Sequence, residues 1–257
     1  MTNSRFERGN FTMKSIELSP NEQIDDLQIM DLKIIQKKDG FKFGTDAVLL
    51  SDFAKSIQSE HTLDLCTGTG IIPLLLRAKS KTRRFTAVEI QQEMADMAKK
   101  SMLLNNLSDE IEVVCEDLKN SVKLFGKRKF DLITCNPPYI RSGVLNSTDT
   151  KTVSRHEILC TLEDIIRVSS DLLTTTGRLC IVHRPSRVAE LLYLMKANRI
   201  EPKRIRFVHK NQNEPPVLVL VEGLFGGGCD VNVMKPLIMY KENFELTDEM
   251  KEIYNFD

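Results

Sequence analysis

The stretch Thr62-Leu63-Asp64-Leu65-Cys66-Thr67-Gly68-Thr69-Gly70, which runs into the apolar segment 71–78, decides the fold. Residues 62–65 form a short apolar run of strand length, and residues 70–78 carry the apolar content of a buried helix. Glycines between a strand and a helix let a ligand approach backbone atoms closely. The stretch therefore predicts a strand, a ligand-binding loop and a helix in succession.

The same alternation of strand and helix continues along the chain. The expected strands are 62–65, 85–88, 111–115, 130–135, 178–182, 204–208 and 217–221. The expected helices between them are 70–78, 91–105, 162–173 and 187–198. Such alternation predicts an α/β fold whose mainly parallel, seven-stranded sheet has helices on both faces, and the last two strands read as a closing antiparallel hairpin.

Local signals predict where several elements begin and end. Thr161, with Asp164 three residues on, should start the helix at 162, and Gly177 lies where that helix should stop. Apolar runs at 27–29 and 32–35 flank Lys38-Asp39-Gly40, which predicts a hairpin turn, and Thr45 should cap the next helix. We expect a flexible N-terminus (1–25), a hairpin and helix cap (26–60), a core domain (61–223) and a C-terminal tail without a recognisable motif (224–257).

Composition limits the class of protein. With 257 residues, 41% of them hydrophobic, the chain can bury one substantial core, and its 36 basic and 36 acidic residues require any nucleic acid to bind a local patch. Six cysteines without a Cys-x-x-Cys pair predict buried thiols in a reducing compartment, with no disulfide frame and no metal site. No apolar run could span a bilayer or act as a signal peptide. We therefore expect a cytoplasmic enzyme or binding protein with no membrane contact, and we favour a monomer.

A second informative stretch is Phe130-Asp131-Leu132-Ile133-Thr134-Cys135-Asn136-Pro137-Pro138-Tyr139. Two consecutive prolines cannot continue a central strand, so the backbone must leave the sheet after Cys135 in a stiff, fixed direction. The Asn136 amide oxygen and the Pro137 carbonyl can each accept an N–H group, and Tyr139 can stack on a flat ring. This turn suits a planar amine, although an ordinary strand-ending turn is the alternative on these residues alone.

Acidic residues follow the second and third strands. Glu89 ends the run 85–89, and an acidic residue at this position, after the second strand, commonly binds ribose hydroxyls. Asp117 follows the third strand, 111–115. The loop at Gly68 and Gly70 lacks the third glycine of a dinucleotide fingerprint and the Gly-Lys-Ser/Thr of a P-loop. All these residues should lie at the carboxyl edge of the sheet, where open α/β sheets bind ligands.

The loop resembles motif I of class I S-adenosylmethionine-dependent methyltransferases, with Cys66 in place of the first glycine, and Asn136 to Tyr139 resemble their motif IV for planar amines. This resemblance implies a Rossmann-like fold and S-adenosylmethionine as the cofactor, with no metal. It implies that the cofactor is bound by Asp64, Cys66, Thr67, Gly68, Gly70, Glu89, Ile90, Asp117, Leu118 and Asn136. It also implies catalytic roles for Asn136, Pro137 and Tyr139, which would hold the amine for methyl transfer.

Three segments together resemble the bacterial tRNA(Val) adenine N(6)-methyltransferase family: residues 41–50, the Asn136 to Tyr139 turn, and Arg155-His156-Glu157. The resemblance implies methylation of an adenosine next to the anticodon of a tRNA, with Phe43 and Thr45 over the methionine end of the cofactor. Substrate contacts are expected from Pro138, Arg141, Arg155 and Arg184. The alternatives are a glutamine N-methyltransferase acting on release factors, an rRNA base N-methyltransferase, and a non-catalytic cofactor-binding module. A helical recognition domain, which the release-factor enzymes carry before the core, is absent before Asp64.

Overall fold

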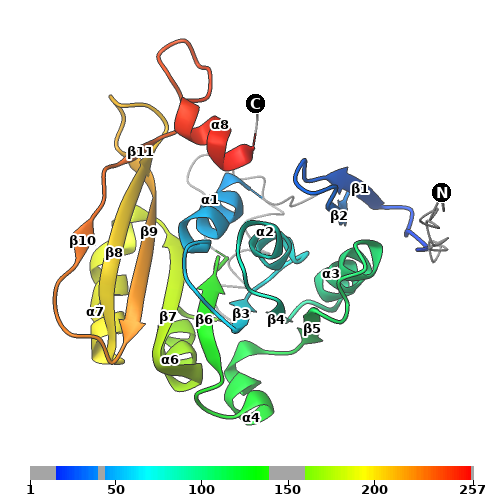
Figure 1. Ribbon diagram of the computed structural model, residues 1–257, viewed down its shortest axis with the longest axis horizontal. Helices are drawn as coiled ribbons and strands as arrows, with labels where there is room; N and C mark the ends of the chain where they lie inside the picture. The colour runs from blue at the N-terminus through cyan, green and yellow to red at the C-terminus, as the bar shows by residue number, and fades with distance from the viewer. Residues whose placement is uncertain (1–15, 40–43, 139–159, 256–257) are drawn as a thin grey trace, which may run out of the picture.

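The computed structural model describes residues 16–39, 44–138 and 160–255 (Figure 1). Its strands are β1 (Glu22–Asp26), β2 (Lys33–Lys37), β3 (His61–Leu65), β4 (Arg84–Glu89), β5 (Ile111–Cys115), β6 (Phe130–Cys135), β7 (Leu173–His183), β8 (Ile200–His209), β9 (Pro216–Phe225), β10 (Asn232–Val233) and β11 (Leu237–Ile238). Its helices are α1 (Thr45–Ala54), α2 (Ile71–Lys79), α3 (Gln92–Leu104), η1 (Leu118–Asn120), α4 (Ser121–Phe125), α6 (Leu162–Leu172), η2 (Pro185–Arg187), α7 (Val188–Ala197) and α8 (Asp248–Tyr254).

The seven predicted strands form the central sheet in the order β5-β4-β3-β6-β7-β9-β8, and the two-residue strands β10 and β11 both pair with β8. All neighbours from β5 to β7 are parallel, whereas β9 is antiparallel to both β7 and β8. The α/β class and the mainly parallel sheet are thus confirmed. The strand order reverses between β3 and β6, and ligands of open α/β sheets bind at such a switch point.

Alternating side chains of the buried strands supply two cores, one on each face of the sheet. Leu132 of β6 packs with α1 and α2, while its neighbour Ile133 packs with α6 and α7. On β7, Cys180 packs in the same core as Leu132, and Ile181 packs in the same core as Ile133. Because both faces are covered by helices, these strands read as continuous apolar runs, which is why they could be found from the sequence.

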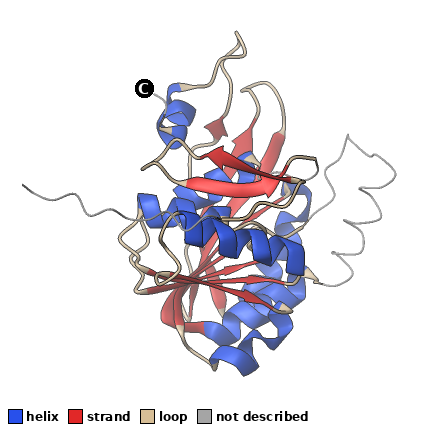
Figure 2. Cartoon of the chain, turned by 90° about the vertical axis from the view of Figure 1, so that its right-hand side faces the viewer, coloured by secondary structure: helices blue, strands red, loops and turns tan. Residues whose placement is uncertain are grey.

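The N-terminal hairpin forms, but its predicted turn at Lys38-Asp39-Gly40 is wrong. Strands β1 and β2 pair antiparallel and are joined by residues 27–32, above the main sheet (Figure 2). That connection holds Gln28, Met30 and Asp31 at positive φ without a glycine, and Asp31 is the only one of these three that belongs to the usual turn residues. Strand β1 begins at Glu22, inside the segment 1–25 that we expected to be flexible.

Two predicted boundary residues act differently in the structure. Gly44, not Thr45, is the N-cap of α1, so Thr45 is the first helical residue. Helix α6 ends at Leu172, and Gly177 lies within β7, where a side chain would meet the Phe130 carbonyl oxygen at 3.0 Å. In contrast, the predicted capping box of α6 is confirmed, since Thr161 Oγ1 accepts from the Asp164 N–H at 3.1 Å.

The six cysteines are free thiols, but burial is less complete than predicted. Cys135 and Cys180 are buried, Cys66, Cys115 and Cys160 are half-buried, and Cys229 is exposed. None of the described helices combines the length and apolar character needed to cross a membrane.

Candidate active site

The carboxyl ends of β3 and β6 lie side by side and bring the two informative stretches together. Leu65 pairs with Cys135 in the parallel register, so the Cys66 loop and the Asn136 turn leave the sheet at the same level. On the other side, Leu65 pairs with Val88 and Glu89 pairs with Cys115. The four strand ends therefore form one continuous edge on which a ligand can rest.

In the loop after β3, every second residue has a left-handed backbone conformation. Cys66, Gly68 and Gly70 have φ values of 58°, 59° and 86°, and the Thr67 N–H donates to the Val88 carbonyl oxygen at 3.0 Å. A Cβ at Gly68 would point into open space, which leaves room for a ligand against the backbone. Gly70 is favoured by its φ of 86°, and a Cβ there would also lie 2.5 Å from Met102 Cε, so the end of that side chain would have to move.

Glu89 binds two backbone donors at the end of β4. Its Oε2 accepts from the Gly68 N–H and its Oε1 from the Gln91 N–H, both at 2.9 Å, and the side chain is only 5% exposed. An ionised carboxylate has about four acceptor positions, so two remain for hydroxyl groups of a ligand. Glu89, which we predicted to bind ribose hydroxyls, is therefore fixed to the glycine loop.

Asp64 is buried directly beneath the loop. Its Oδ1 accepts from Thr134 Oγ1 at 2.6 Å, which links β3 to β6 two residues before Asn136. Its Oδ2 is buried without a hydrogen-bond partner among the described residues, as is Thr67 Oγ1. Burial raises the pKa of Asp64 to about 7. These two buried polar atoms lie below an open glycine. Atoms that hydrogen-bond a polar, cationic ligand would lack partners in this way without the ligand.

Asp117 has a structural role that the sequence did not reveal. Its Oδ1 accepts from the Lys119 N–H at 2.9 Å and caps η1, and its Oδ2 lies 3.2 Å from Lys119 Nζ. Leu118 is buried, while Ile90, directly after β4, is exposed. All three stand at the predicted edge, and their roles toward a cofactor stay a prediction.

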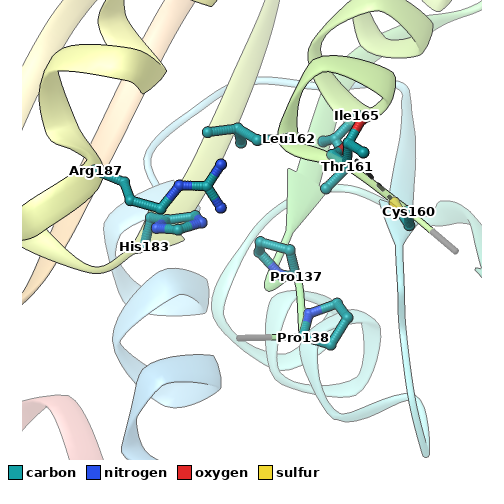
Figure 3. A pocket seen from close by; sticks show the side chains of 8 residues that line it. All are labelled: Pro137, Pro138, Cys160, Thr161, Leu162, Ile165, His183 and Arg187. Carbon is teal, nitrogen blue, oxygen red and sulfur yellow. Dashed lines mark hydrogen bonds between the residues drawn. The ribbon is translucent and has the colours of Figure 1, made fainter. Parts of the chain in front are cut away.

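A pocket of about 200 Å³ opens beside the Asn136 turn (Figure 3). Pro137 and Pro138 line one side, and His183 and Arg187 approach from the end of β7. The remaining lining residues, from the start of α6, are Cys160, Thr161, Leu162 and Ile165. The pocket thus joins the predicted amine-binding turn to a wall with nitrogen donors.

His183 is neutral and its tautomer is determined. Its Nδ1 accepts from the Arg184 N–H at 2.8 Å, so the ring proton lies on Nε2. Burial, with the Arg187 charge nearby, lowers the pKa of His183 to about 4. Arg187 in turn donates to both Glu190 oxygens, at 2.7 and 2.5 Å. In this tautomer the Nε2 of His183 can act only as a hydrogen-bond donor.

The thiols near the site are poor nucleophiles. A hydrogen bond with the Cys135 thiol, together with burial, raises the pKa of Cys66 well above its usual range. Burial raises the pKa of Cys135 as well. The described part of the chain also contains no group of three or more His, Cys, Asp or Glu side chains placed to hold a metal ion.

Several predicted site residues fall outside the described ranges: Phe43, Tyr139, Arg141 and Arg155. Of the remainder, Asn136 and Pro138 are half-buried and Pro137 is buried directly after β6. Arg184 follows β7 and is half-buried at the same edge. The sequence reasoning missed Thr134, although a polar residue inside an apolar strand could have indicated it.

Comparison with known proteins identifies the family. The methyltransferase small domain matches residues 27–197, about two thirds of the chain. The chain belongs to this family. It is 32% identical over 188 residues to the "tRNA1(Val) (adenine(37)-N6)-methyltransferase" of Porphyromonas gingivalis, covering 70% of this chain and 73% of that protein. The protein of the same name from Bacteroides thetaiotaomicron is 29% identical over 236 residues, 88% of this chain and 94% of its own length.

Solved structures agree with the methyltransferase fold. The "predicted O-methyltransferase" of Agrobacterium tumefaciens has a TM-score of 0.68 at 24% identity, over 82% of this chain and 96% of its own. A 16S rRNA N2 methyltransferase of T. thermophilus, in complex with AdoMet and guanosine, has a TM-score of 0.56 at 16% identity, over 81% of this chain and 52% of its own. At these identities the likeness concerns the fold.

The methyltransferase site fits S-adenosylmethionine, the methyl donor. The orphaned Asp64 and Thr67 oxygens can satisfy the polar methionine end, the open space at Gly68 can admit the body of the cofactor, and the two unused Glu89 positions can accept its ribose hydroxyls. The donors and acceptors present therefore match the polar groups of this cofactor.

Proposed function

We propose that this methyltransferase transfers a methyl group from S-adenosylmethionine to the exocyclic amine of an adenosine in tRNA, next to the anticodon. The observation that carries the proposal is the parallel register of Leu65 with Cys135, which puts the cofactor loop beside the Asn136-Pro137 turn. The relatives named as tRNA1(Val) adenine methyltransferases support the choice of substrate.

The protein's own task in this reaction is to position the amine. S-adenosylmethionine, when bound, supplies an activated methyl group on a sulfonium sulfur. The Asn136 side-chain oxygen and the Pro137 carbonyl would each accept one N–H of the target amine and direct its lone pair toward that methyl group. These bonds favour the more tetrahedral nitrogen of the transition state. Tyr139, outside the described residues, would stack on the base, and the proton released after methylation passes to solvent.

The RNA would bind at the carboxyl edge of the sheet, which has its own basic residues. Arg184, Arg187 and Lys210 follow the ends of β7 and β8, and we assign Arg141 and Arg155 to the same surface. The basic runs 77–84 and 123–129 precede β4 and β6, so they lie at the opposite edge. Because lysine plus arginine equals aspartate plus glutamate, this local patch and not the net charge would attract phosphates.

The remaining assignments are parts of the same proposal. A tRNA substrate and a reducing environment for six free thiols support a cytoplasmic enzyme. We propose that it acts as a monomer with its core at residues 61–223, and that Pro138 contacts the substrate.

A labelled-methyl assay tests the substrate directly. Bulk tRNA that lacks the modification should accept label, while release factor and rRNA should not. Asn136→Ala should lower the rate by about 100- to 1,000-fold, the usual cost of losing one transition-state contact. Its affinity for S-adenosylmethionine should stay within about threefold of wild type.

Asn232→Ala, an exposed asparagine on the edge strand β10, is the matched control and should keep full activity. Label in release factor would overturn the choice of substrate. Unchanged turnover in Asn136→Ala would overturn the mechanism.

A further inference from the structure

The C-terminal helix α8 lies at the same edge of the sheet as the candidate active site. Strand β11 pairs Leu237 with Val208 and Ile238 with His209, at the carboxyl end of β8, and the Tyr240 N–H donates to the Lys210 carbonyl oxygen at 2.8 Å. Figure 1 shows α8 beside α1, at the end of the sheet toward which the arrow of β6 points. Helix α8 therefore reaches the edge where ligands bind.

Helix α8 is held firmly in this place. Met250 and Ile253 are buried in the core that also contains α1 and α2. Lys79 Nζ, at the end of α2, donates to the Ile253 carbonyl oxygen at 2.7 Å, and Arg206 pairs with Glu249 at 2.6 Å. These contacts fix the last turn of α8 against α1 and α2, so a side chain there has a defined position.

Tyr254 uses that position to contact Thr45. The Tyr254 hydroxyl donates to Thr45 Oγ1 at 3.1 Å, across 209 positions of sequence. Burial raises the pKa of Tyr254, so its hydroxyl stays protonated and can donate at physiological pH. Because Thr45 Oγ1 accepts this bond, the Thr45 O–H remains a donor for another group.

Thr45 begins α1, which packs against α2, the helix that follows the glycine loop. Val48 of α1 packs in one core with Ile71 and Ile72 at the start of α2. The first turns of both helices therefore contribute to one core. The methionine end of S-adenosylmethionine carries a carboxylate, which accepts hydrogen bonds from hydroxyl groups and from N–H groups of a first helical turn.

We infer that Tyr254 is a positioning residue of the cofactor site, which orients the Thr45 hydroxyl toward the methionine end of S-adenosylmethionine. The inference rests on the proposed function and takes Thr45 as one of the residues that bind its cofactor. It gives the C-terminal tail, which lies beyond the matched residues 27–197, a part in cofactor binding.

The test is the affinity of the purified full-length protein for S-adenosylmethionine, measured by calorimetry. Tyr254→Phe removes one hydroxyl group and should weaken binding about three- to tenfold, the effect of one hydrogen bond. The rate at saturating cofactor and the KM for tRNA should stay within twofold. Tyr193→Phe changes an exposed tyrosine on α7 and should leave affinity unchanged.

A double-mutant cycle separates positioning from a merely structural role. Thr45→Val should weaken binding, Thr45→Ser should retain it, and Tyr254→Phe should cost nothing further in the Thr45→Val background. Additive losses, or wild-type affinity in Tyr254→Phe, would overturn the inference while the proposed function stands. A wild-type protein that does not bind S-adenosylmethionine would overturn both. Binding without methylation of tRNA would overturn only the choice of substrate.

Discussion

Asp64 makes the stability of the protein depend on pH. Its pKa rises from 3.8 in the free side chain to about 7 in the folded chain. Below about pH 4 the carboxyl group is protonated in both states and has no effect. As pH rises from about 4 to about 7 the unfolded chain ionises first, so folding loses stability, on the order of 4 kcal/mol at most.

Asp64→Asn removes this titration and keeps an oxygen that can accept from Thr134 Oγ1. The free energy of unfolding of the wild type, relative to that of Asp64→Asn, should therefore fall as pH rises from about 4 to about 8. Urea unfolding without cofactor at a series of pH values measures this difference. Parallel curves for the two proteins would show that Asp64 titrates normally.

For single residues, the sequence predicted the position in the fold better than the side-chain contacts. Glu89 ends an apolar strand and Asp64 is one residue before the end of another, so the alternation of strand and helix placed both at the carboxyl edge. Gly70 was expected to admit the cofactor, but its tight packing depends on Met102, 32 positions further along. The Tyr254–Thr45 bond had no local signal at all, since a hydrogen bond between distant residues leaves no pattern in either segment.

Between β3 and α2, the two glycines of one loop should respond differently to the same substitution. Gly68→Ala places a Cβ in open space at φ 59° and should cost about 1 kcal/mol of stability, but weaken S-adenosylmethionine binding at least about tenfold. Gly70→Ala drives a Cβ against Met102 and Ala98 and should cost about 2–4 kcal/mol, with the smaller effect on binding. Urea unfolding and calorimetry on both variants measure the two quantities. The reverse order of binding losses would contradict a ligand above Gly68.

Elements with two buried faces were predicted well, and elements with charged or irregular sequences were not. Strand β1 reads Glu-Gln-Ile-Asp-Asp, which has no apolar run, and its turn places Gln28 and Met30, two residue types that rarely do so, at positive φ. The strands of the central sheet, by contrast, were predicted because burial of both faces makes them continuous apolar runs. Helix α8 escaped notice because its buried face consists of only Met250 and Ile253.

In the molecule as a whole, Glu222 connects the antiparallel end of the sheet to α1. This residue of β9 is 2% exposed and pairs with both Arg178 of β7 and Arg204 of β8. Arg204 Nη2 also donates to the Phe53 carbonyl oxygen at 2.9 Å, and its guanidinium lies 4.4 Å from the centroid of the Phe53 ring. One carboxylate thus joins three strands and, through Arg204, a helix.

Glu222→Gln leaves two arginines facing each other without an anion between them. Breaking a buried ion pair usually lowers the free energy of unfolding by about 3–5 kcal/mol. Because both arginines reach solvent, we expect a loss of about 2 kcal/mol, which urea unfolding measures. Glu201→Gln, which breaks the more exposed pair with Lys196, is the control and should give no measurable change. A stable Glu222→Gln variant would show that the sheet end is held by packing alone.

The place of β9 has a consequence for how the chain is made. Because β9 lies between β7 and β8, yet follows both in sequence, β7 has no partner on that side until residues 216–225 have left the ribosome. Throughout that interval the nascent chain exposes an apolar edge, with Leu179 and Ile181, that can pair with other chains. Translation that stalls before Phe225 should therefore release an aggregation-prone product, and the short time needed to synthesise the last strand becomes the period in which a chaperone is needed.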